Sequence, residues 1–576
     1  VGPSDVVRPL RLEEIADRNL SGAMAPPELI GGSSAAQCDA GHAVAALDAI
    51  ALREKACDGD AEVADKKPRL AEGKGRSRGA VLLRAVERVF PLLAMCSIPL
   101  MLALVAVSCL APVDVNLALM QFSSADKAQA LTPALVDFQC EISRPLMMLL
   151  RGRESARTLY SQTFAPLWAS RALLSARGHA CYFGFVLLQF VLQLALPGRV
   201  ALGETTPAGH RWPYKMNGLL ALMVTAALFV LATFALDLFS PAIYYEHFFG
   251  AFAAANELAA AAVALCYFKA WFAPSTQVPG GPKTTADVKW SGSVFADLYK
   301  GVELNTRLFG GRFDVKMFVI ARVGMIGWAM VNLSALLAQQ RASNSTGTAS
   351  LAMMLINVLQ LVYVVDLLAR EEWYLSTIDI MTDRCGFYLL YGGAVFVPVA
   401  YCLQSMWLIR HADVELSATR AAAIALLFTV SYGAFLDSNW QRTQFRRDYV
   451  ALGPARTTVG LLGNRVLRSS APPKLVRASW RAADGRSRAT VLLADGYWRL
   501  ARHINYTADL GMCFAFGLCS GRAPLADALP WFYFVFMLVL LTHRALRDER
   551  RMRDKYGRAY DAYTAQVPYV MLPGVW

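Results

Sequence analysis

VFPLLAMCSIPLMLALVAVSCL, the stretch from Val89 to Leu110, runs for 22 residues without one charged side chain. A helix needs about 20 consecutive apolar residues to cross the hydrocarbon core of a bilayer, which is about 30 Å thick. Within a bilayer the backbone must satisfy its own hydrogen bonds, so such a run forms a helix. This stretch therefore predicts a transmembrane helix and decides the class of the fold.

Similar apolar runs recur along the chain, and together they predict an all-α, polytopic membrane protein with about ten transmembrane helices. Charged residues make up only 18% of the 576 residues, against about 25% in average soluble domains, which argues against an ordinary soluble enzyme. The other predicted spans are Ala180–Leu196, Asn217–Leu236, Phe248–Phe268, Arg322–Leu337, Ala349–Val365, Cys385–Leu408, Ala421–Leu436 and a final hairpin of Asp509–Cys519 and Ala528–Thr542.

Three regions are expected from composition: a disordered polar segment at 1–78, a transmembrane half at 79–440 and a C-terminal half at 441–576. The net charge of +13 is read first as topology, because cytoplasmic loops of membrane proteins collect Lys and Arg. The densely basic segment Trp440–His503 is therefore placed in the cytosol, and eight spans before it put the N-terminus there too. No nucleic-acid partner is expected, because the basic residues are divided among many loops.

Several common sites are excluded by their missing motifs. The chain has no GxGxxG fingerprint, Walker loop, GxSxG elbow or HExxH helix. Its 11 cysteines are scattered and include no CxxC pair, so neither a zinc site nor a disulfide framework is predicted. A bound nucleotide would need something other than a Rossmann fold.

Basic and aromatic residues in the C-terminal half are candidates for binding a phosphate-bearing cofactor. Arg442 and Arg446, spaced i and i+4, share one helix face and can fork onto a phosphate; an ordinary basic membrane flank is the open alternative. Rings and amides follow at Trp498, Asn505 and Tyr506, which an interfacial aromatic belt would also explain. A charged helical stripe then joins Arg544, Asp548, Arg551 and Lys555 and continues into Tyr556, Tyr560 and Tyr563; its alternative is a solvated face.

Acidic residues expected inside the membrane are costly to hold there and are candidates for function. They are Glu257, Asp366, Asp379 and Asp383. Tyr363 precedes Asp366 by three positions, so its phenol can share a helix face with that carboxylate. The alternative for each acid is that it only joins helices together.

Several separate motifs across residues 180–576 resemble the sterol reductase family. That family includes sterol C14-reductases, 7-dehydrocholesterol (C7) reductases and the C-terminal domain of the lamin B receptor. The motifs are DLYKGVELNTR at Asp297–Arg307, EWYLSTIDI at Glu372–Ile380, LLTHRALRDE at Leu540–Glu549, Lys555-Tyr556-Gly557 and Leu572-Pro573-Gly574. Trp373-Tyr374-Leu375 and Leu572-Pro573-Gly574 have the form of the C7 branch.

The resemblance implies NADPH-dependent reduction of a sterol ring double bond in the endoplasmic reticulum membrane, with the nuclear envelope as another location. The C7–C8 bond of a 5,7-diene sterol is the expected target; C14 reduction and a non-catalytic sterol-binding scaffold of the lamin B receptor type are the alternatives. Sterol and membrane lipid are the expected partners, and no oligomeric state is predicted. By matching motif, the cofactor contacts fall on Arg442, Arg446, Leu493, Trp498, Asn505, Tyr506, Arg544, Asp548, Lys555, Tyr556 and Tyr563, and the catalytic candidates are Tyr363, Asp366 and Asp548.

The chain departs from the family pattern at five places. Two of them, Arg499 and Ala508, flank the expected nicotinamide pocket. The other three are Thr306 and Val323, which stand where the family has proline, and Gly393, which replaces an aspartate.

Overall fold

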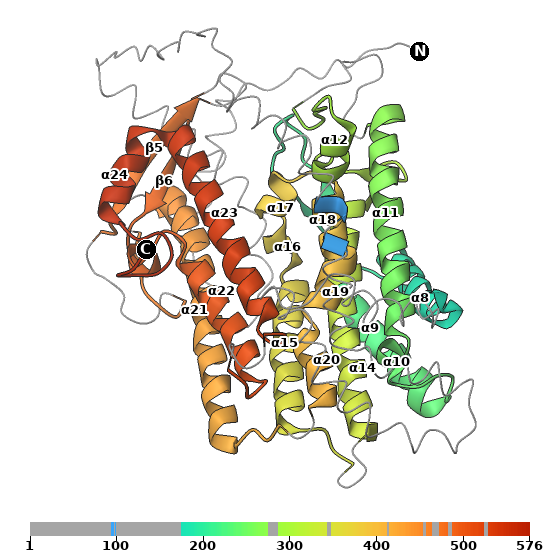
Figure 1. Cartoon of the computed structure of the whole chain (residues 1–576). Helices are drawn as coiled ribbons and strands as arrows, with labels where there is room; N and C mark the ends of the chain where they lie inside the picture. The colour runs from blue at the N-terminus through green and yellow to red at the C-terminus, as the bar shows by residue number, and fades with distance from the viewer. Residues whose placement is uncertain are drawn as a thin grey trace, which may run out of the picture.

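The computed structural model describes residues 94–96, 98–99, 174–274, 286–342, 347–411, 414–452, 457–463, 472–481, 487–523 and 528–576. Long helices run side by side through most of this structure, and the C-terminal helices line one flank of the bundle (Figure 1). The segment 1–78 and nearly all of the first predicted span, Val89–Leu110, lie outside the described residues.

Seven helical stretches in the described residues are long and apolar enough to cross a membrane. Each of them overlaps a predicted span, and apolar side chains such as Met223, Val358 and Leu426 remain exposed on their outer faces, as lipid contact requires. The stretches are α8 (Ala176–Ala195), α9 with η4 (Gly218–Val230, Leu231–Ala235), α11 (Phe248–Phe272), α13 with η5 and α14 (Val315–Met317, Phe318–Ile326, Gly327–Ala342), α15 (Leu351–Ala369), α18 with η6, α19 and α20 (Phe387–Tyr391, Gly392–Phe396, Val397–Ala400, Leu403–Arg410) and α21 (Ala418–Leu452).

The last two predicted spans form helices, but neither meets the same requirement. The helix α22 (Ile504–Leu518) has 15 residues, about 22 Å at 1.5 Å per residue, which is less than the bilayer core. The helix α23 (Phe532–Tyr556) has 25 residues, of which the second half is strongly charged. The two helices pack against each other, as the predicted hairpin requires.

The described structure is mostly helical, as expected, but three short antiparallel hairpins that were not predicted lie outside the long helices. They were missed because their strands are short or highly charged, and such segments read as loops. The hairpins pair β1 (Arg199–Leu202) with β2 (Pro213–Met216), β3 (Arg307–Leu308) with β4 (Phe313–Asp314), and β5 (Leu475–Arg481) with β6 (Ser487–Leu493). Short helices complete the fold: α10 (Ile243–Glu246), α12 (Val294–Lys300), α16 (Glu371–Tyr374), α17 (Ile378–Met381), η7 (Gly496–Arg499) and α24 (Arg558–Gln566).

Two π-helical segments, η5 and η6, cross in the centre of the bundle at Gly324 and Gly393. A Cβ on Gly393 would stand 2.9 Å from Cγ1 of Val319, and one on Gly324 would stand 2.8 Å from the carbonyl oxygen of Gly393. Any larger residue would force the segments apart, so this packing explains the glycine at position 393.

A buried ion pair between Arg322 and Glu371 joins η5 to α16. Nη2 of Arg322 donates to Oδ1 of Asn217 at 2.9 Å, and the backbone N–H of Gly218 donates to Oε2 of Glu371 at 3.1 Å. Removing one partner of such a buried pair costs about 3–5 kcal/mol. The Asn217-Gly218 motif therefore holds the start of α9 against the bundle.

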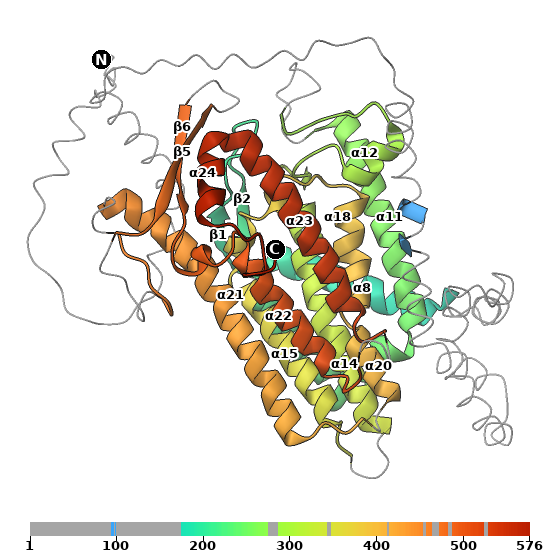
Figure 2. The ribbon, with the colours of Figure 1, turned by 60° about the vertical axis from the view of Figure 1, so that its left-hand side comes forward.

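The helix α21 runs for 35 residues across the predicted boundary at 440 and 441 without a break. Its later turns pack on α22, on η7 and on β6. Seen from the second direction, β5, β6 and α24 lie together beyond the end of the helix bundle (Figure 2). The C-terminal part is therefore attached to the membrane helices through a continuous helix.

Candidate functional site

The predicted cofactor residues come from six elements that meet at one end of the bundle: α21, β6, η7, α22, α23 and α24. The guanidinium carbon of Arg442 lies 4.8 Å from the ring centroid of Trp498. Trp498 is 5% exposed, and its indole N–H donates to the carbonyl of Ser438 at 3.0 Å. The ring is thus fixed against α21, with the cation of Arg442 stacked on its face.

The turn that carries Trp498 is held by Gln441. Its Oε1 accepts from the backbone N–H of Tyr497 at 3.0 Å, and its Nε2 donates to the carbonyl of Gly460 at 2.7 Å. Gly496 has a φ of +61°, and a Cβ there would stand 2.4 Å from Nε2 of Gln441. This position accepts only glycine because both the backbone conformation and the space exclude a side chain.

Leu493 closes the wall behind Trp498 and presents no polar group. It is 6% exposed and packs in a small core with Phe445, Val491 and Trp498. Its predicted contact with a cofactor is therefore apolar.

Several predicted residues gather around Arg442. Tyr506, Asp548 and Tyr563 all lie within electrostatic range of its guanidinium, although they come from α22, α23 and α24. Tyr563 also lies within range of Arg446, as does Tyr556. The i,i+4 pair of arginines therefore faces residues from three other helices.

Two further residues of the predicted set begin α22. The side-chain amide of Asn505 donates to Oδ1 of Asn439 at 3.3 Å. The ring of Tyr506 stacks on His503, with centroids 5.2 Å apart and planes inclined by 14°. Both side chains remain partly exposed at the cofactor end of the helix.

The predicted charged stripe on α23 has two different environments. Arg544 points to the other flank of the site and pairs with Asp379 of α17 at 2.6 Å. Asp548 instead pairs with Arg551 on its own helix, also at 2.6 Å. Arg544 thus links the two parts of the chain and is not available as a free phosphate ligand.

Lys555 lies at the far end of the stripe, with its Nζ 3.9 Å from the ring centroid of Trp480 and 5.0 Å from that of Tyr556. Burial, together with the neighbouring positive charges of Arg551 and Arg446, lowers the pKa of Lys555 to about 8. A cation crowded by other cations is stabilised by an anion, so this is a favourable place for a phosphate.

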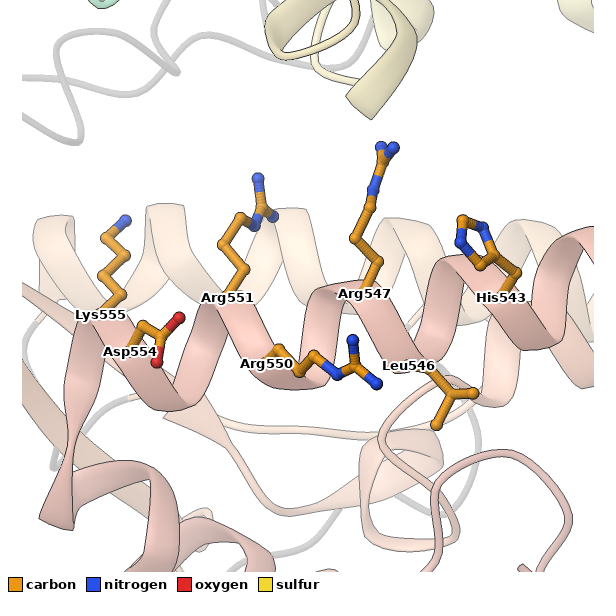
Figure 3. Close-up of a pocket in the computed structure, with 7 residues that line it drawn as sticks. All are labelled: His543, Leu546, Arg547, Arg550, Arg551, Asp554 and Lys555. Atoms are coloured by element: carbon orange, nitrogen blue, oxygen red, sulfur yellow. The ribbon is translucent and has the colours of Figure 1, made fainter. Parts of the chain in front are cut away.

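A groove along α23 opens beside these residues. It has a volume of about 680 Å³, and His543, Arg547, Arg551 and Lys555 extend from the helix to the same side of it (Figure 3). Asp554 is the acid in its lining. The groove therefore places an excess of positive charge next to the predicted cofactor residues.

This set of donors fits a dinucleotide phosphate. Arg442, Arg446 and Lys555 supply cations for phosphate groups. Trp498 and Tyr556 supply ring faces on which an aromatic base can stack.

The catalytic candidates of α15 lie deeper in the bundle and do not act as the expected pair. Asp366 accepts a hydrogen bond from the hydroxyl of Tyr432 at 2.7 Å and pairs with Arg370 at 2.5 Å. The hydroxyl of Tyr363 has no hydrogen-bond partner among the described residues, and its ring packs on Trp328 with centroids 5.7 Å apart. The phenol of Tyr363 therefore makes no hydrogen bond within the described residues, whereas the carboxylate of Asp366 is bound by Tyr432 and Arg370.

The other acids expected inside the membrane are paired. Asp379 also accepts from the hydroxyl of Tyr374 at 3.1 Å. Asp383 pairs with Arg547 at 3.2 Å, and Glu257 pairs with His179 at 3.2 Å. These pairings support the structural alternative for the three acids.

Among the buried acids that were not sequence candidates, Asp509 near the start of α22 follows the predicted cofactor residues Asn505 and Tyr506. It is 7% exposed, and its Oδ1 is buried without a hydrogen-bond partner. The available signal was an acid at the border of an apolar run, three positions after Tyr506. The two departures from the family pattern that were expected beside the nicotinamide pocket differ in exposure. Arg499 is exposed, whereas Ala508 is 8% exposed.

Comparison with known proteins identifies the family of the chain. The model of the "Ergosterol biosynthesis ERG4/ERG24 family" matches residues 117–576. A protein of Xenopus laevis named 7-dehydrocholesterol reductase is 34% identical over 442 residues, which are 76% of this chain and 87% of the relative. A Danio rerio protein of the same name is 34% identical over 450 residues, 76% of this chain and 86% of the relative.

A relative with a different name is found as well. A Gallus gallus protein named Delta(14)-sterol reductase LBR is 33% identical over 407 residues, which are 70% of this chain and 58% of the relative. The match to the family model covers well over half of the sequence, and its apolar helices agree with a membrane protein. The chain therefore belongs to the ERG4/ERG24 family of sterol reductases and is an oxidoreductase of sterol biosynthesis.

Proposed function

We propose that this protein uses NADPH to reduce the C7–C8 double bond of a 5,7-diene sterol. Support comes from the 7-dehydrocholesterol reductases among its relatives and from the cations and rings gathered around Arg442 and Lys555. Bound NADPH would supply a hydride to the sterol. Arg442, Arg446 and Lys555 would hold its phosphates, and Trp498, Tyr506 and Tyr556 would pack on its rings.

The reaction needs an acid as well as a hydride. A sterol alkene is electron-rich, so a proton must reach one carbon before or together with the attack of hydride on the other. A positioned acid contributes about 10²–10⁴-fold to such a rate. Tyr363 is the proposed donor, because its hydroxyl lies in the bundle interior without a hydrogen-bond partner in the described structure.

The unpartnered hydroxyl of Tyr363 is the single observation that carries the chemical half of the proposal. A phenol used only for packing gains from a hydrogen bond when it is buried. Asp548, the competing donor, has its Oδ1 2.6 Å from Nη2 of Arg551, so its carboxylate is already held on its own helix. An assisting role of Asp366 stays a prediction, to be tested beside both.

Reduction of a C14 double bond is the second candidate, because a Delta(14)-sterol reductase is also among the relatives. The proposed cofactor residues would serve either reaction. The sterol pocket alone would distinguish the two substrates. The narrow apolar cavity between α8, α11 and α14, about 40 Å³, is too small for a sterol ring system.

A sterol profile tests the proposed function. Membranes that contain the protein would receive a 5,7-diene or a 14-ene sterol with NADPH or NADH, and the products would be identified by mass spectrometry. We expect loss of the diene with NADPH. Consumption of the 14-ene alone would transfer the assignment to C14 reduction.

We also propose an endoplasmic reticulum location with both termini in the cytosol. A cysteine introduced beside Arg481, at the end of β5, should react with a membrane-impermeant reagent on the cytosolic face of intact microsomes. Reaction only after permeabilisation would reverse the orientation and move the cofactor site to the lumen.

A further inference from the structure

Asp509 differs from the other acids near the site because it has no partner. It makes no hydrogen bond or ion pair with any described residue, and it is 7% exposed. Asp366, Asp379 and Asp548 each pair with an arginine. Burying an unpaired carboxylate is costly, and a carboxyl group in such a place avoids the cost by holding its proton.

Its position on α22 lies between the cofactor residues and the buried phenols. Tyr506, Asp509 and Cys513 are spaced i, i+3 and i+7, so they follow one face of the helix. Tyr506 belongs to the proposed cofactor set. Cys513 lies in the apolar core against which Tyr363 and Tyr401 pack.

The phenols of this region lie close to one another. Tyr401 and Tyr533 have ring centroids 4.2 Å apart, and Trp328 contacts both of them as well as Tyr363. Asp509 lies within electrostatic range of Tyr363, although the two side chains make no hydrogen bond to each other. The acid and the proposed donor therefore face the same apolar core.

The nearest cation does not neutralise Asp509. Arg544 lies within electrostatic range of it but pairs with Asp379 at 2.6 Å, and Tyr374 binds the other oxygen of Asp379 at 3.1 Å. A carboxyl group retained only for helix packing would be expected to use an available partner. Asp509 has no such partner among the described residues, so its carboxyl group is not held by a hydrogen bond or an ion pair.

We propose that Asp509 stores the proton that Tyr363 delivers to the sterol, a role that rests on the proposed function. The O–H bond of Tyr363 breaks as a C–H bond forms at one alkene carbon, and the other carbon accepts the hydride supplied by NADPH, which is oxidised to NADP⁺. The O–H bond of the neutral carboxyl of Asp509 breaks in turn, and its proton restores the phenol through a bridging water, because the two groups are not hydrogen-bonded to each other. Water from the cofactor end returns a proton to the carboxylate before the next turnover.

This role makes Asp509 a positioning and relay residue that acts through Tyr363. Asp509→Asn keeps the size of the side chain and removes its exchangeable acid. We expect kcat to fall by about 10²–10⁴-fold, the contribution of general acid catalysis, with little change in KM or in NADPH affinity. Asp509→Glu should recover part of kcat because it restores a carboxyl group.

Two readouts separate a proton relay from a structural role. The solvent deuterium isotope effect on kcat should rise in Asp509→Asn, because proton delivery becomes more strongly rate-limiting. Infrared difference spectra between H₂O and D₂O should contain the carbonyl stretch of a neutral carboxylic acid in the parent protein and lack it in Asp509→Asn. Asp366→Asn, whose carboxylate is held by Arg370 and Tyr432, is the matched control and should keep this band.

The possible outcomes decide between the two claims. A parent protein that reduces neither sterol overturns the proposed function, whereas an active parent with a nearly unaffected Asp509→Asn variant overturns only the relay. An unchanged carbonyl band in Asp509→Asn also overturns the relay, whatever the activity. If Asp509→Asn does not fold, a missing carbonyl band in the parent or a lack of activity in a folded Asp509→Glu variant has the same meaning.

Discussion

Replacing Arg446 with alanine tests whether the cofactor site exists. The alternative role of Arg446 is that of an ordinary basic residue beside the membrane. Arg446 is exposed, and the rings of Tyr556 and Tyr563 lie within its electrostatic range. A hydrogen bond to a charged group contributes about 1.5–3 kcal/mol. Because solvent screens an exposed cation, we expect the lower end of that range, which is about a tenfold rise in the Kd for NADPH.

The same helix provides a matched control. Arg420 is also exposed on α21 but lies 26 residues earlier, about 39 Å along the helix axis. Arg420→Ala removes the same charge and should leave the Kd for NADPH unchanged. Both variants keep the length and composition of the apolar part of α21, so membrane insertion should be equal.

The assay is a titration of NADPH fluorescence in the solubilised protein at two salt concentrations. The loss caused by Arg446→Ala should shrink at 1 M salt, where the Debye length falls to about 3 Å. If the two variants bind NADPH equally well, Arg446 is an ordinary basic flank and the phosphate assignment is wrong. If both weaken binding alike, the effect comes from net charge and not from a site.

Three further predictions follow from individual groups. Since the pKa of Lys555 is lowered to about 8, the affinity for NADPH should fall as pH rises from 7 to 9, whereas Lys555→Arg should bind almost independently of pH in that interval. Tyr363→Phe keeps the ring on Trp328 and should lose about 10²–10⁴-fold in turnover with intact NADPH binding; near-parental turnover would exclude Tyr363 as the donor. Glu549→Gln breaks the buried pair with Arg502, so the protein should be less stable by about 3–5 kcal/mol in thermal unfolding.

The stability prediction for Glu549 has a defined pH dependence. Burial opposes its ionisation, but hydrogen bonds from His503, Arg502 and Tyr560 outweigh that and lower its pKa to about 2. The folded pKa is thus below the ordinary value of about 4.3. The stabilisation is present above pH 4.3 and is lost as pH falls towards 2, so parent and Glu549→Gln should converge in stability at acid pH.

The long helices were predictable because lipid imposes one strong constraint, an uncharged run of sufficient length. Within the described residues this constraint located all seven apolar stretches, from α8 to α21. It gave no information on β5 and β6, which lie outside the long helices. Pairing in that hairpin depends on partners such as Ala478 and Thr490, and no short-range pattern reveals them.

The candidate site was likewise predictable only where its pattern is local in the sequence. Arg442 and Arg446 were visible as an i,i+4 pair because helix geometry is local. The stacking of Arg442 on Trp498 joins residues 56 positions apart, and only the fold brings them together. For Asp366 the local spacing suggested a pair with Tyr363. Tyr432 on another helix binds the carboxylate instead. The isolation of Asp509 could not be predicted, since a missing partner is a property of the whole packing.

Tracing the two added hydrogens tests the central claim most directly. The protein would be given a 5,7-diene sterol with NADPH carrying deuterium in its transferable position, and separately with ordinary NADPH in D₂O. We expect one deuterium at one carbon of the former C7–C8 bond in the first case and one at the adjacent carbon in the second. Deuterium from the solvent at both carbons, or an unchanged diene with reduction at C14, would contradict the account.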